Sequence, residues 1–329
     1  MEILSSSDQD LEKAAAALAA GLLVAFPTET VYGLGADAFN ISALARIFEA
    51  KNRPRFDPLI VHIAERDDLS RIIDTASLDS SAKEHLSILS EQLWPGPLTL
   101  ILPKRPELPG LATAGLSTAA VRFPSHPVAQ KLIRLSTGAV AAPSANPFGY
   151  VSPTEAGHVA EQLGDIVDLI IDGGPSAVGV ESTILSFEAS GPVVLRVGGT
   201  PVEALQSVLG RIGVQIETVS RPSVPGQMKR HYSTRTPLEI IELSESITIG
   251  SKEERIGLLT LSLMEDASRY AAVEILSSSG DLREAAAGLF RALRRLDALS
   301  LDRIVARPFP EKELGLAIMD RLRRCAARE

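Results

Sequence analysis

Short apolar runs alternate with helical patterns along most of the chain before Gly210. Apolar runs bounded by turn residues are typical of buried strands, and apolar residues that recur every three or four positions are typical of helices. The runs predict strands over 22–26, 59–63, 98–102, 120–123, 139–142, 169–172, 183–187 and 193–197. The helical spacing predicts helices over 42–50, 81–93, 128–135 and 154–163.

This alternation of strands and helices indicates an α/β layered fold. Several predicted strands follow one another without an intervening helix, which favours a mixed sheet over a purely parallel one. Ser7 precedes a further, alanine-rich amphipathic helix, and Thr154 is the first residue of the helical pattern over 154–163. Both residue types are favoured as N-caps, so we expect each to begin its helix.

The pattern breaks between residues 210 and 237 and then resumes. The stretch Arg221–Gly226 contains two prolines, which cannot lie in a central strand or a helix interior. A connection this long and irregular is usually functional or disordered. We therefore predict a first domain over 1–209, a linker over 210–237 and a smaller α/β domain over 238–329. In that last domain we predict strands over 238–243, 256–261, 272–276 and 304–307, and helices over 281–296 and 314–325.

Composition narrows the class of protein. A net charge of −8 argues against a surface built to grip nucleic acid, which needs excess Lys and Arg. Cys325 is the one cysteine in the chain, so neither an internal disulfide nor a cysteine-rich zinc site is expected. The sequence shows no signal-peptide pattern and no apolar run of membrane-spanning length, so we expect a soluble, cytoplasmic protein with no membrane partner.

The segment Pro27–Gly35 is the strongest indication of a binding site. It follows the predicted strand over 22–26, and open α/β sheets bind ligands beyond the carboxyl ends of their strands. Two threonines and a glutamate present short polar groups, while Gly33 and Gly35 let the backbone turn or approach a ligand closely. The segment indicates a small-molecule site, although an ordinary strand–helix connection would account for it if it stood alone.

A second indication is a group of three cations in the five residues from Lys51 to Arg55. Pro54 forces this stretch out of helix, so Lys51 and Arg53 could face one pocket. Fixed cations next to the start of a strand could bind the phosphates of a ligand. A charged segment exposed to solvent would explain the same residues. Further polar turns lie at the ends of predicted strands at 143–146, 172–174, 181–183 and 195–199, and a helix follows 152–154.

Several familiar chemistries lack their motifs. The five histidines never occur at metal-ligand spacing, and neither a serine-hydrolase elbow nor a GxxxxGK[ST] phosphate loop is present. Residues 33–38 fit the relaxed GxGxxA dinucleotide pattern. However, polar residues separate this pattern from its strand where a tight turn is required, so we do not expect a nicotinamide or flavin site.

Taken together, these segments resemble the threonylcarbamoyl-AMP synthases, specifically the longer type with a YrdC domain and a C-terminal extension. The resemblance covers nearly the whole chain in the family's order. The matching stretches are 27–35, 51–54, 58–62, 94–99, 121–124, 143–146, 152–154, 181–183, 225–233 and 314–322. The fold implied is a YrdC-like twisted mixed sheet with helices, followed by a smaller Rossmann-like α/β domain.

The resemblance implies an enzyme that condenses L-threonine, bicarbonate and ATP into threonylcarbamoyl-AMP and pyrophosphate. Its product would pass to a downstream transferase that modifies an adenosine of certain transfer RNAs, with weak or no direct binding of transfer RNA by this chain. Mg2+ would arrive on the phosphates of ATP, with no metal ligand from the protein. Such chemistry needs alignment and charge neutralisation more than a protein nucleophile.

The resemblance also implies roles for individual residues. Those that would hold threonine are Thr30, His62, Arg122, Ala142 and Ser182, with Arg122 on its carboxylate. Those that would surround ATP are Lys51, Arg53, Asp57, Thr118, Ser144, Asn146, Arg196 and Tyr232, with Lys51 and Arg53 taking part in catalysis. The linker would fold over the cavity as a lid that excludes water, closed by Arg230, His231 and Tyr232.

The chain departs from the family's usual pattern at three places. Val197 stands where the family often has proline, Thr234 stands where the lid commonly has proline, and residues 147–150 replace a small glycine-containing turn. The last departure makes the nucleotide side of the site less certain than the threonine side. Two other functions remain open from the sequence, a non-catalytic RNA-binding module and carbamoyl transfer in hydrogenase maturation, and the net charge and the single cysteine weigh against them.

Overall fold

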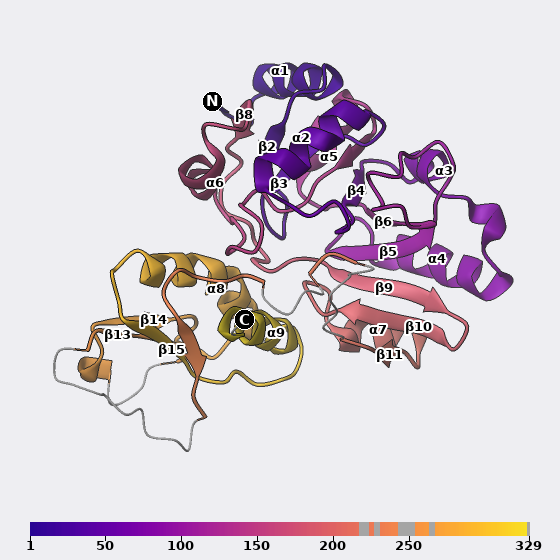
Figure 1. Ribbon diagram of the computed structural model, residues 1–329. Coiled ribbons are helices and arrows are strands. Elements are labelled where there is room, and N and C mark those ends of the chain that lie inside the picture. The colour runs from indigo at the N-terminus through magenta and orange to yellow at the C-terminus, as the bar shows by residue number, and fades with distance from the viewer. Residues whose placement is uncertain (217–223, 227–230, 243–253, 263–266, 328–329) are drawn as a thin grey trace.

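The computed structural model describes residues 1–216, 224–226, 231–242, 254–262 and 267–327. These residues form two β-sheets with helices packed against them (Figure 1). The first sheet has eleven strands and the second has four. Among the described helices, none combines the length and the apolar character needed to cross a bilayer.

The first sheet is mixed, as the sequence predicts. Its strands are β1 (Glu2–Leu4), β2 (Val24–Phe26), β3 (Gly33–Asp37), β4 (Ile60–Ile63), β5 (Leu98–Pro103), β6 (Thr118–Arg122), β7 (Ala139–Ala141), β8 (Leu169–Ile171), β9 (Thr183–Glu188), β10 (Gly191–Arg196) and β11 (Gly213–Val214). They lie in the order β1-β8-β2-β3-β7-β4-β6-β5-β9-β10-β11. The sheet contains both parallel pairs, such as β4 with β6, and antiparallel pairs, such as β4 with β7.

Helices cover both faces of this sheet. They are α1 (Asp8–Ala19), α2 (Ile41–Lys51), α3 (Leu69–Ile72), α4 (Ser80–Gln92), α5 (Pro127–Leu135), α6 (Ala156–Leu163) and α7 (Val202–Leu209), with short 3-10 turns at Arg66–Asp68 and Thr75–Ser77. Helices α1 and α5 share one apolar cluster with Phe26 and Val140, whereas α2 and α4 share the other with Ala25 and Val61. Neighbouring strand residues thus point to opposite faces, as the pleat requires.

Helix caps follow the sequence at most termini. Ser7 accepts a hydrogen bond from the Asp10 amide and begins α1, as predicted. Asn40 caps α2 in the same way, and α2 ends at Asn52, whose φ of 51° is left-handed. The prediction that Thr154 begins α6 is wrong, because the helix starts at Ala156 and the side chain of Thr154 bonds to no protein group in the described structure.

The second sheet is parallel throughout. Its strands are β12 (Leu238–Ile240), β13 (Ile256–Thr260), β14 (Ala272–Ile275) and β15 (Arg303–Ala306), in the order β12-β15-β13-β14. It carries helices α8 (Leu282–Asp297) and α9 (Leu314–Ala326) and a 3-10 turn at Ala267–Arg269. Helices α8 and α9 pack on each other and lie on the side of this sheet that faces the first one (Figure 1). Leu243, the predicted end of the first of these strands, lies outside the described residues.

Two further sequence predictions need correction. Gly33 and Gly35 do not form a turn, because they lie in β3, antiparallel to β2. A Cβ on Gly35 would lie 2.8 Å from the Phe26 ring and 2.9 Å from the Val140 side chain, so glycine serves close packing there. The region after Gly210 is also not wholly irregular, since β11 pairs in parallel with β10. The short elements β1 and α7 were not predicted.

Candidate active site

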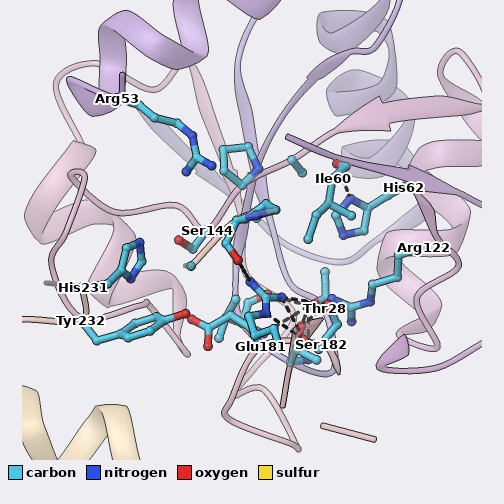
Figure 2. Close-up of a pocket in the computed structure, with 18 residues that line it drawn as sticks. Thr28, Arg53, Ile60, His62, Arg122, Ser144, Glu181, Ser182, His231 and Tyr232 are labelled. Atoms are coloured by element: carbon cyan, nitrogen blue, oxygen red, sulfur yellow. Dashed lines mark hydrogen bonds between the residues drawn. The ribbon is translucent and has the colours of Figure 1, made fainter. Parts of the chain in front are cut away.

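A cavity opens where the ends of several strands of the first sheet meet residues of the 210–237 segment (Figure 2). It is lined by Thr28, Thr30, Val31, Gly33, Arg53, Ile60, His62, Arg122, Ala142, Pro143, Ser144, Glu181, Ser182, Arg196, Pro225, Gly226, His231 and Tyr232. Polar segments that are far apart in the sequence therefore converge on one cavity, from the amino ends of strands (Ile60, Ser182) as well as from the carboxyl ends (Arg122, Ser144).

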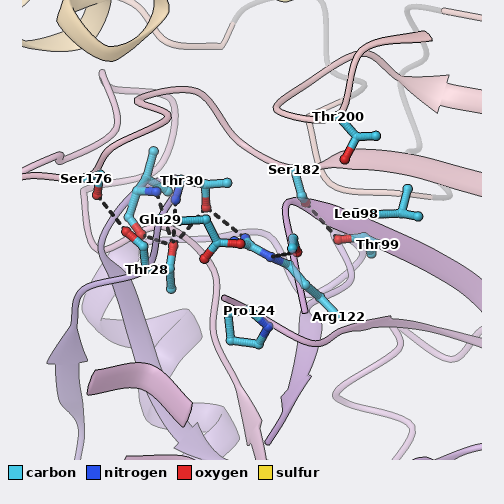
Figure 3. A network of polar contacts seen from close by, with 12 residues as sticks. Thr28, Glu29, Thr30, Leu98, Thr99, Arg122, Pro124, Ser176, Ser182 and Thr200 are labelled. Atoms are coloured by element: carbon cyan, nitrogen blue, oxygen red, sulfur yellow. Dashed lines mark hydrogen bonds and ion pairs between the residues drawn. The ribbon is translucent and has the colours of Figure 1, made fainter. Parts of the chain in front are cut away.

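All five residues expected to hold threonine line this cavity: Thr30, His62, Arg122, Ala142 and Ser182. Arg122 ends β6, and its guanidinium donates a hydrogen bond of 2.8 Å to the Thr30 hydroxyl. The Ser182 hydroxyl lies 2.7 Å from that of Thr99, which holds Ser182 against β5 (Figure 3). The side chains form a buried polar pocket with a fixed cation at one end.

Glu29 is a neighbour of this pocket that received no separate role from the sequence. Its carboxylate lies 2.8 Å from Nη2 of Arg122, with both side chains less than a tenth exposed (Figure 3). Burial is the largest influence and raises the pKa of Glu29, but the charge of Arg122 together with the nearby polar groups outweighs burial and holds that pKa below its usual range. The contact is close but poorly aligned, so neither Glu29 oxygen nor Arg122 Nη2 makes a protein hydrogen bond in the described structure. Arg122 therefore keeps donor capacity for a ligand carboxylate.

His62 lies in the same pocket as a neutral ring. Its Nδ1 lies 3.1 Å from the Ile60 carbonyl, which can only accept, so Nδ1 carries the proton. Burial and the charge of Arg122 lower the pKa of His62 to about 3. The imidazole adds a polar edge to the pocket without adding a second positive charge at neutral pH.

The predicted phosphate-binding cations occupy two different positions. Arg53 lines the cavity, forms a buried ion pair of 2.9 Å with Asp57, and places its guanidinium 5.8 Å from the centre of the Phe148 ring. Lys51 lies behind the wall, where Nζ donates to the carbonyls of Ser144 and Asn146. Burial, followed by the charge of Arg53, lowers the pKa of Lys51 well below its ordinary value.

Four residues expected around ATP do not line the cavity. Lys51 and Asp57 lie behind Ser144 and Arg53, and the Asn146 amide donates to the carbonyls of Pro147 and Tyr150. Thr118 begins β6, four residues before Arg122. Alternate strand residues share a face, so Thr118 lies on the Arg122 side of the sheet, about 13 Å farther along. That separation suits an elongated ligand rather than a compact one.

Arg196 joins the sheet to the segment after it. Its guanidinium donates to the Ser182 carbonyl at 2.9 and 3.1 Å, to the Ser182 hydroxyl at 3.1 Å and to the Pro225 carbonyl at 3.1 Å. Gly198 makes this approach possible, because a Cβ there would lie 2.3 Å from the Glu181 carbonyl oxygen. Val197, where the family often has proline, does not displace Arg196 from the cavity.

The described part of the predicted lid also reaches the cavity. His231 lies edge-on to Phe148, with ring centres 5.9 Å apart, and 4.1 Å from the ring of Tyr232. Both residues line the cavity, together with Pro225 and Gly226. Arg230 lies outside the described residues. The lid role of this segment stays a prediction.

The chain matches known proteins along nearly its whole length. Residues 16–198 match a family model described as telomere recombination, and residues 200–327 match the threonylcarbamoyl-AMP synthase C-terminal domain. A threonylcarbamoyl-AMP synthase of Bacillus subtilis is 45% identical over 98% of this chain and 94% of its own length. The Pyrococcus abyssi enzyme of the same name is 42% identical over 93% of this chain and 91% of its own length.

A solved structure agrees with these sequence matches. The crystal structure of P. abyssi Sua5 complexed with L-threonine is 38% identical, with a TM-score of 0.90 over 99% of this chain and 98% of its own. The fold and the matched sequences define an enzyme of the nucleotidyltransferase type that makes an adenylate. The chain belongs to the threonylcarbamoyl-AMP synthase family. The RNA-binding and hydrogenase-maturation alternatives are not favoured by these relatives.

Proposed function

We propose that this chain condenses L-threonine, bicarbonate and ATP into threonylcarbamoyl-AMP, with release of pyrophosphate. One observation carries the proposal: buried polar side chains around Arg122 and the cations Arg53 and Arg196 line the same cavity. The relatives named threonylcarbamoyl-AMP synthase support the assignment over nearly the whole chain.

On the threonine side, Arg122 pairs with the substrate carboxylate. Thr30, His62 and Ser182 offer hydroxyl and imidazole groups to the amine and the side-chain hydroxyl, and Ala142 leaves room beside them. The P. abyssi Sua5 structure complexed with L-threonine supports a threonine site in this fold. A charge-assisted contact to the carboxylate fixes the orientation of the amine, which is the reacting group.

On the nucleotide side, Arg53, Ser144, Arg196 and Tyr232 face ATP directly. Lys51, Asp57 and Asn146 hold the loops behind them, and Thr118 contacts the far end of the nucleotide along the sheet. Mg2+ enters on the ATP phosphates as part of the substrate, and the described residues contain no group of three or more His, Cys, Asp or Glu that could hold a metal ion. Arg53 and Arg196, the cations that line the cavity, offset the charge that develops on the phosphates, and Lys51 acts from behind by fixing the loop over 144–146.

The reaction then needs two bond-forming steps. The neutral amine of threonine attacks bicarbonate, and loss of water leaves a carbamate. A carbamate oxygen attacks the α-phosphorus of ATP as the bond to the β-phosphate oxygen breaks, so pyrophosphate leaves with the electron pair. The side chains orient the reactants and stabilise charge, and the buried cavity excludes water from the product. A downstream transferase would take this adenylate to transfer RNA, with weak or no transfer RNA binding by this chain.

The proposed reaction predicts that pyrophosphate release requires both threonine and bicarbonate. A coupled pyrophosphate assay with each component omitted in turn measures this, and mass spectrometry should detect the adenylate. Serine should retain weak activity, because one missing methyl costs only about 1–3 kcal/mol of discrimination. Pyrophosphate release at an unchanged rate without threonine would contradict the proposal.

Ligand binding should also protect the described lid residues from hydrogen exchange. Gly226, His231 and Tyr232 line the cavity, so bound threonine and ATP should contact or cover them. Exchange measured by mass spectrometry should slow over 225–233 when both ligands are present, and less with either alone. Helix α1, remote from the cavity, is the internal control. Equal exchange with and without ligands would show that the segment is only a tether.

A further inference from the structure

Arg321, on helix α9 of the C-terminal domain, reaches the wall of the cavity in the first domain. Its side chain is fully buried. Its Nε donates to Glu181 Oε2 at 2.8 Å, and its Nη2 donates to the Val197 carbonyl at 3.1 Å. Both acceptors belong to the first domain, one just before β9 and the other just after β10. A single guanidinium thus ties two strand ends of the active site to the second domain.

The charges around Arg321 keep it ionised. Burial lowers the pKa of its guanidinium, but Tyr232 and the carboxylates of Glu181 and Asp320 outweigh burial and raise that pKa above its ordinary value. Burial also raises the pKa of Glu181, and the charges of Arg321 and Arg196 hold it below its usual range. Arg321 and Glu181 therefore form a charged pair inside the protein, and such a pair depends on its geometry.

Glu181 transmits this contact to the ligand pocket. It lines the cavity next to Ser182, and its second oxygen accepts a hydrogen bond of 2.5 Å from the Ser152 hydroxyl. Its backbone carbonyl accepts from the Gly199 amide at 2.8 Å. With Arg321 on one oxygen and Ser152 on the other, the carboxylate has no free rotation. Glu181 thereby fixes the chain directly before Ser182, whose own hydroxyl contacts Thr99 and Arg196.

Tyr232 receives a second contact from the same guanidinium. The guanidinium carbon of Arg321 lies 4.9 Å from the centre of the Tyr232 ring, and Phe290 of α8 stacks on that ring at 5.6 Å. Tyr232 has a φ of 63°, a left-handed conformation that residues other than glycine rarely adopt. Surrounding contacts must hold such a conformation. Both helices of the C-terminal domain supply those contacts.

We propose that Arg321 is a positioning residue for the active site, acting through Glu181 on Ser182 and through its ring contact on Tyr232. The proposal rests on the proposed function and gives the C-terminal domain a part in it, because helix α9 supports from behind the wall residues Glu181 and Tyr232. Arg321 touches neither substrate itself. The competing explanation is an ion pair that only holds the two domains together.

The test compares three variants by kinetics. Arg321→Met removes both the charge and the planar guanidinium with its several N–H donors. Arg321→Lys keeps the charge without the guanidinium geometry, and Glu181→Gln removes the partner charge. We expect kcat/KM for threonine to fall by about 10- to 100-fold in Arg321→Met, by analogy with the loss of outer partners that orient metal ligands, and by less in Arg321→Lys. Arg323→Met is the matched control, because Arg323 lies on the same helix with its side chain 53% exposed and pairs with Glu311 at the surface.

A double variant separates positioning from simple stabilisation. If Arg321 acts through Glu181, the variant with both Arg321→Met and Glu181→Gln should lose little more activity than the worse single variant. A lower melting temperature with unchanged kcat/KM per folded molecule, or fully additive losses, would overturn the proposal. If Arg321→Met does not fold, the same test of additivity can be made with Arg321→Lys, Glu181→Gln and the double variant that combines these two substitutions.

Hydrogen exchange keeps this test independent of the proposed reaction. In Arg321→Lys and Arg321→Met without ligands, exchange should speed up over 181–183 and 231–232, and Arg323→Met should leave both segments unchanged. If the natural protein forms no adenylate, the proposed function fails while this measurement still decides whether Arg321 orders the cavity wall. Unchanged exchange in both segments would show that Arg321 does not.

Discussion

Arg122→Ala should raise the threonine KM by about 10- to 150-fold, because a hydrogen bond to a charged group contributes about 1.5–3 kcal/mol. Arg122 is buried at the end of β6, and its guanidinium already holds Thr30 at 2.8 Å. ATP affinity should change less, since Arg53 and Arg196 remain in place. Calorimetry of threonine and ATP binding, each measured alone, separates the two effects.

The same substitution should also destabilise the fold, because it leaves Glu29 buried without its cation. Removing one partner of a buried ion pair costs about 3–5 kcal/mol. The double variant Arg122→Met with Glu29→Gln replaces the pair by neutral groups of similar size and should recover part of that stability. It should not recover threonine affinity. If a folded Arg122→Ala protein bound threonine with unchanged affinity, Arg122 would not be a threonine-binding residue.

The strand-end argument explains why much of the site could be predicted from sequence. Thr30, Arg122, Ser144 and Ser182 each lie at or beside an end of a predicted strand. They do not share one edge, because β6 and β7 run in opposite directions on either side of β4 and Ser182 precedes β9, so the cavity gathers both kinds of strand end. The periodicity also predicted most strands and helices, because their buried faces repeat at the spacing of the element. The mixed pairing followed from strands joined without a crossover helix.

Other features depend on tertiary packing and leave no local signal. Arg321 lies between Asp320 and Leu322 in a helix whose last turns are rich in arginine, a pattern typical of a solvated face, yet it is fully buried against Glu181. The sequence predicts a loop at Gly35 because glycine is common in turns. In the structure Gly35 lies in a strand, where the close approach of the Phe26 and Val140 side chains leaves no room for a Cβ. Such contacts join segments far apart in the sequence.

The last prediction concerns acid stability and follows from buried histidines, of which His62 and His231 are the most buried. Burial also lowers the pKa of the half-buried His158 to about 4, so His158 adds to the same loss. His62 and His231 are 3% and 8% exposed, and burial is the first cause that lowers the pKa of each to about 3. In the unfolded chain a histidine titrates near pH 6.5. Between those values the unfolded state binds protons that the folded state does not, so stability is complete above pH 6.5 and falls as the pH falls toward 3. At pH 5 each histidine should already have cost about 2 kcal/mol.

Denaturant unfolding at intervals from pH 7.5 to 5 measures this loss. The window lies above the range in which Glu29 and Glu181 titrate in the unfolded chain, so their depressed pKa values add little to the slope. His231→Phe keeps a ring between Phe148 and Tyr232 and removes the titrating group. The stability lost between pH 7.5 and 5 should therefore be smaller in this variant by the contribution of one histidine, about 2 kcal/mol. A slope that is the same with and without His231 would show that this ring is protonated as readily in the folded protein as in the unfolded chain.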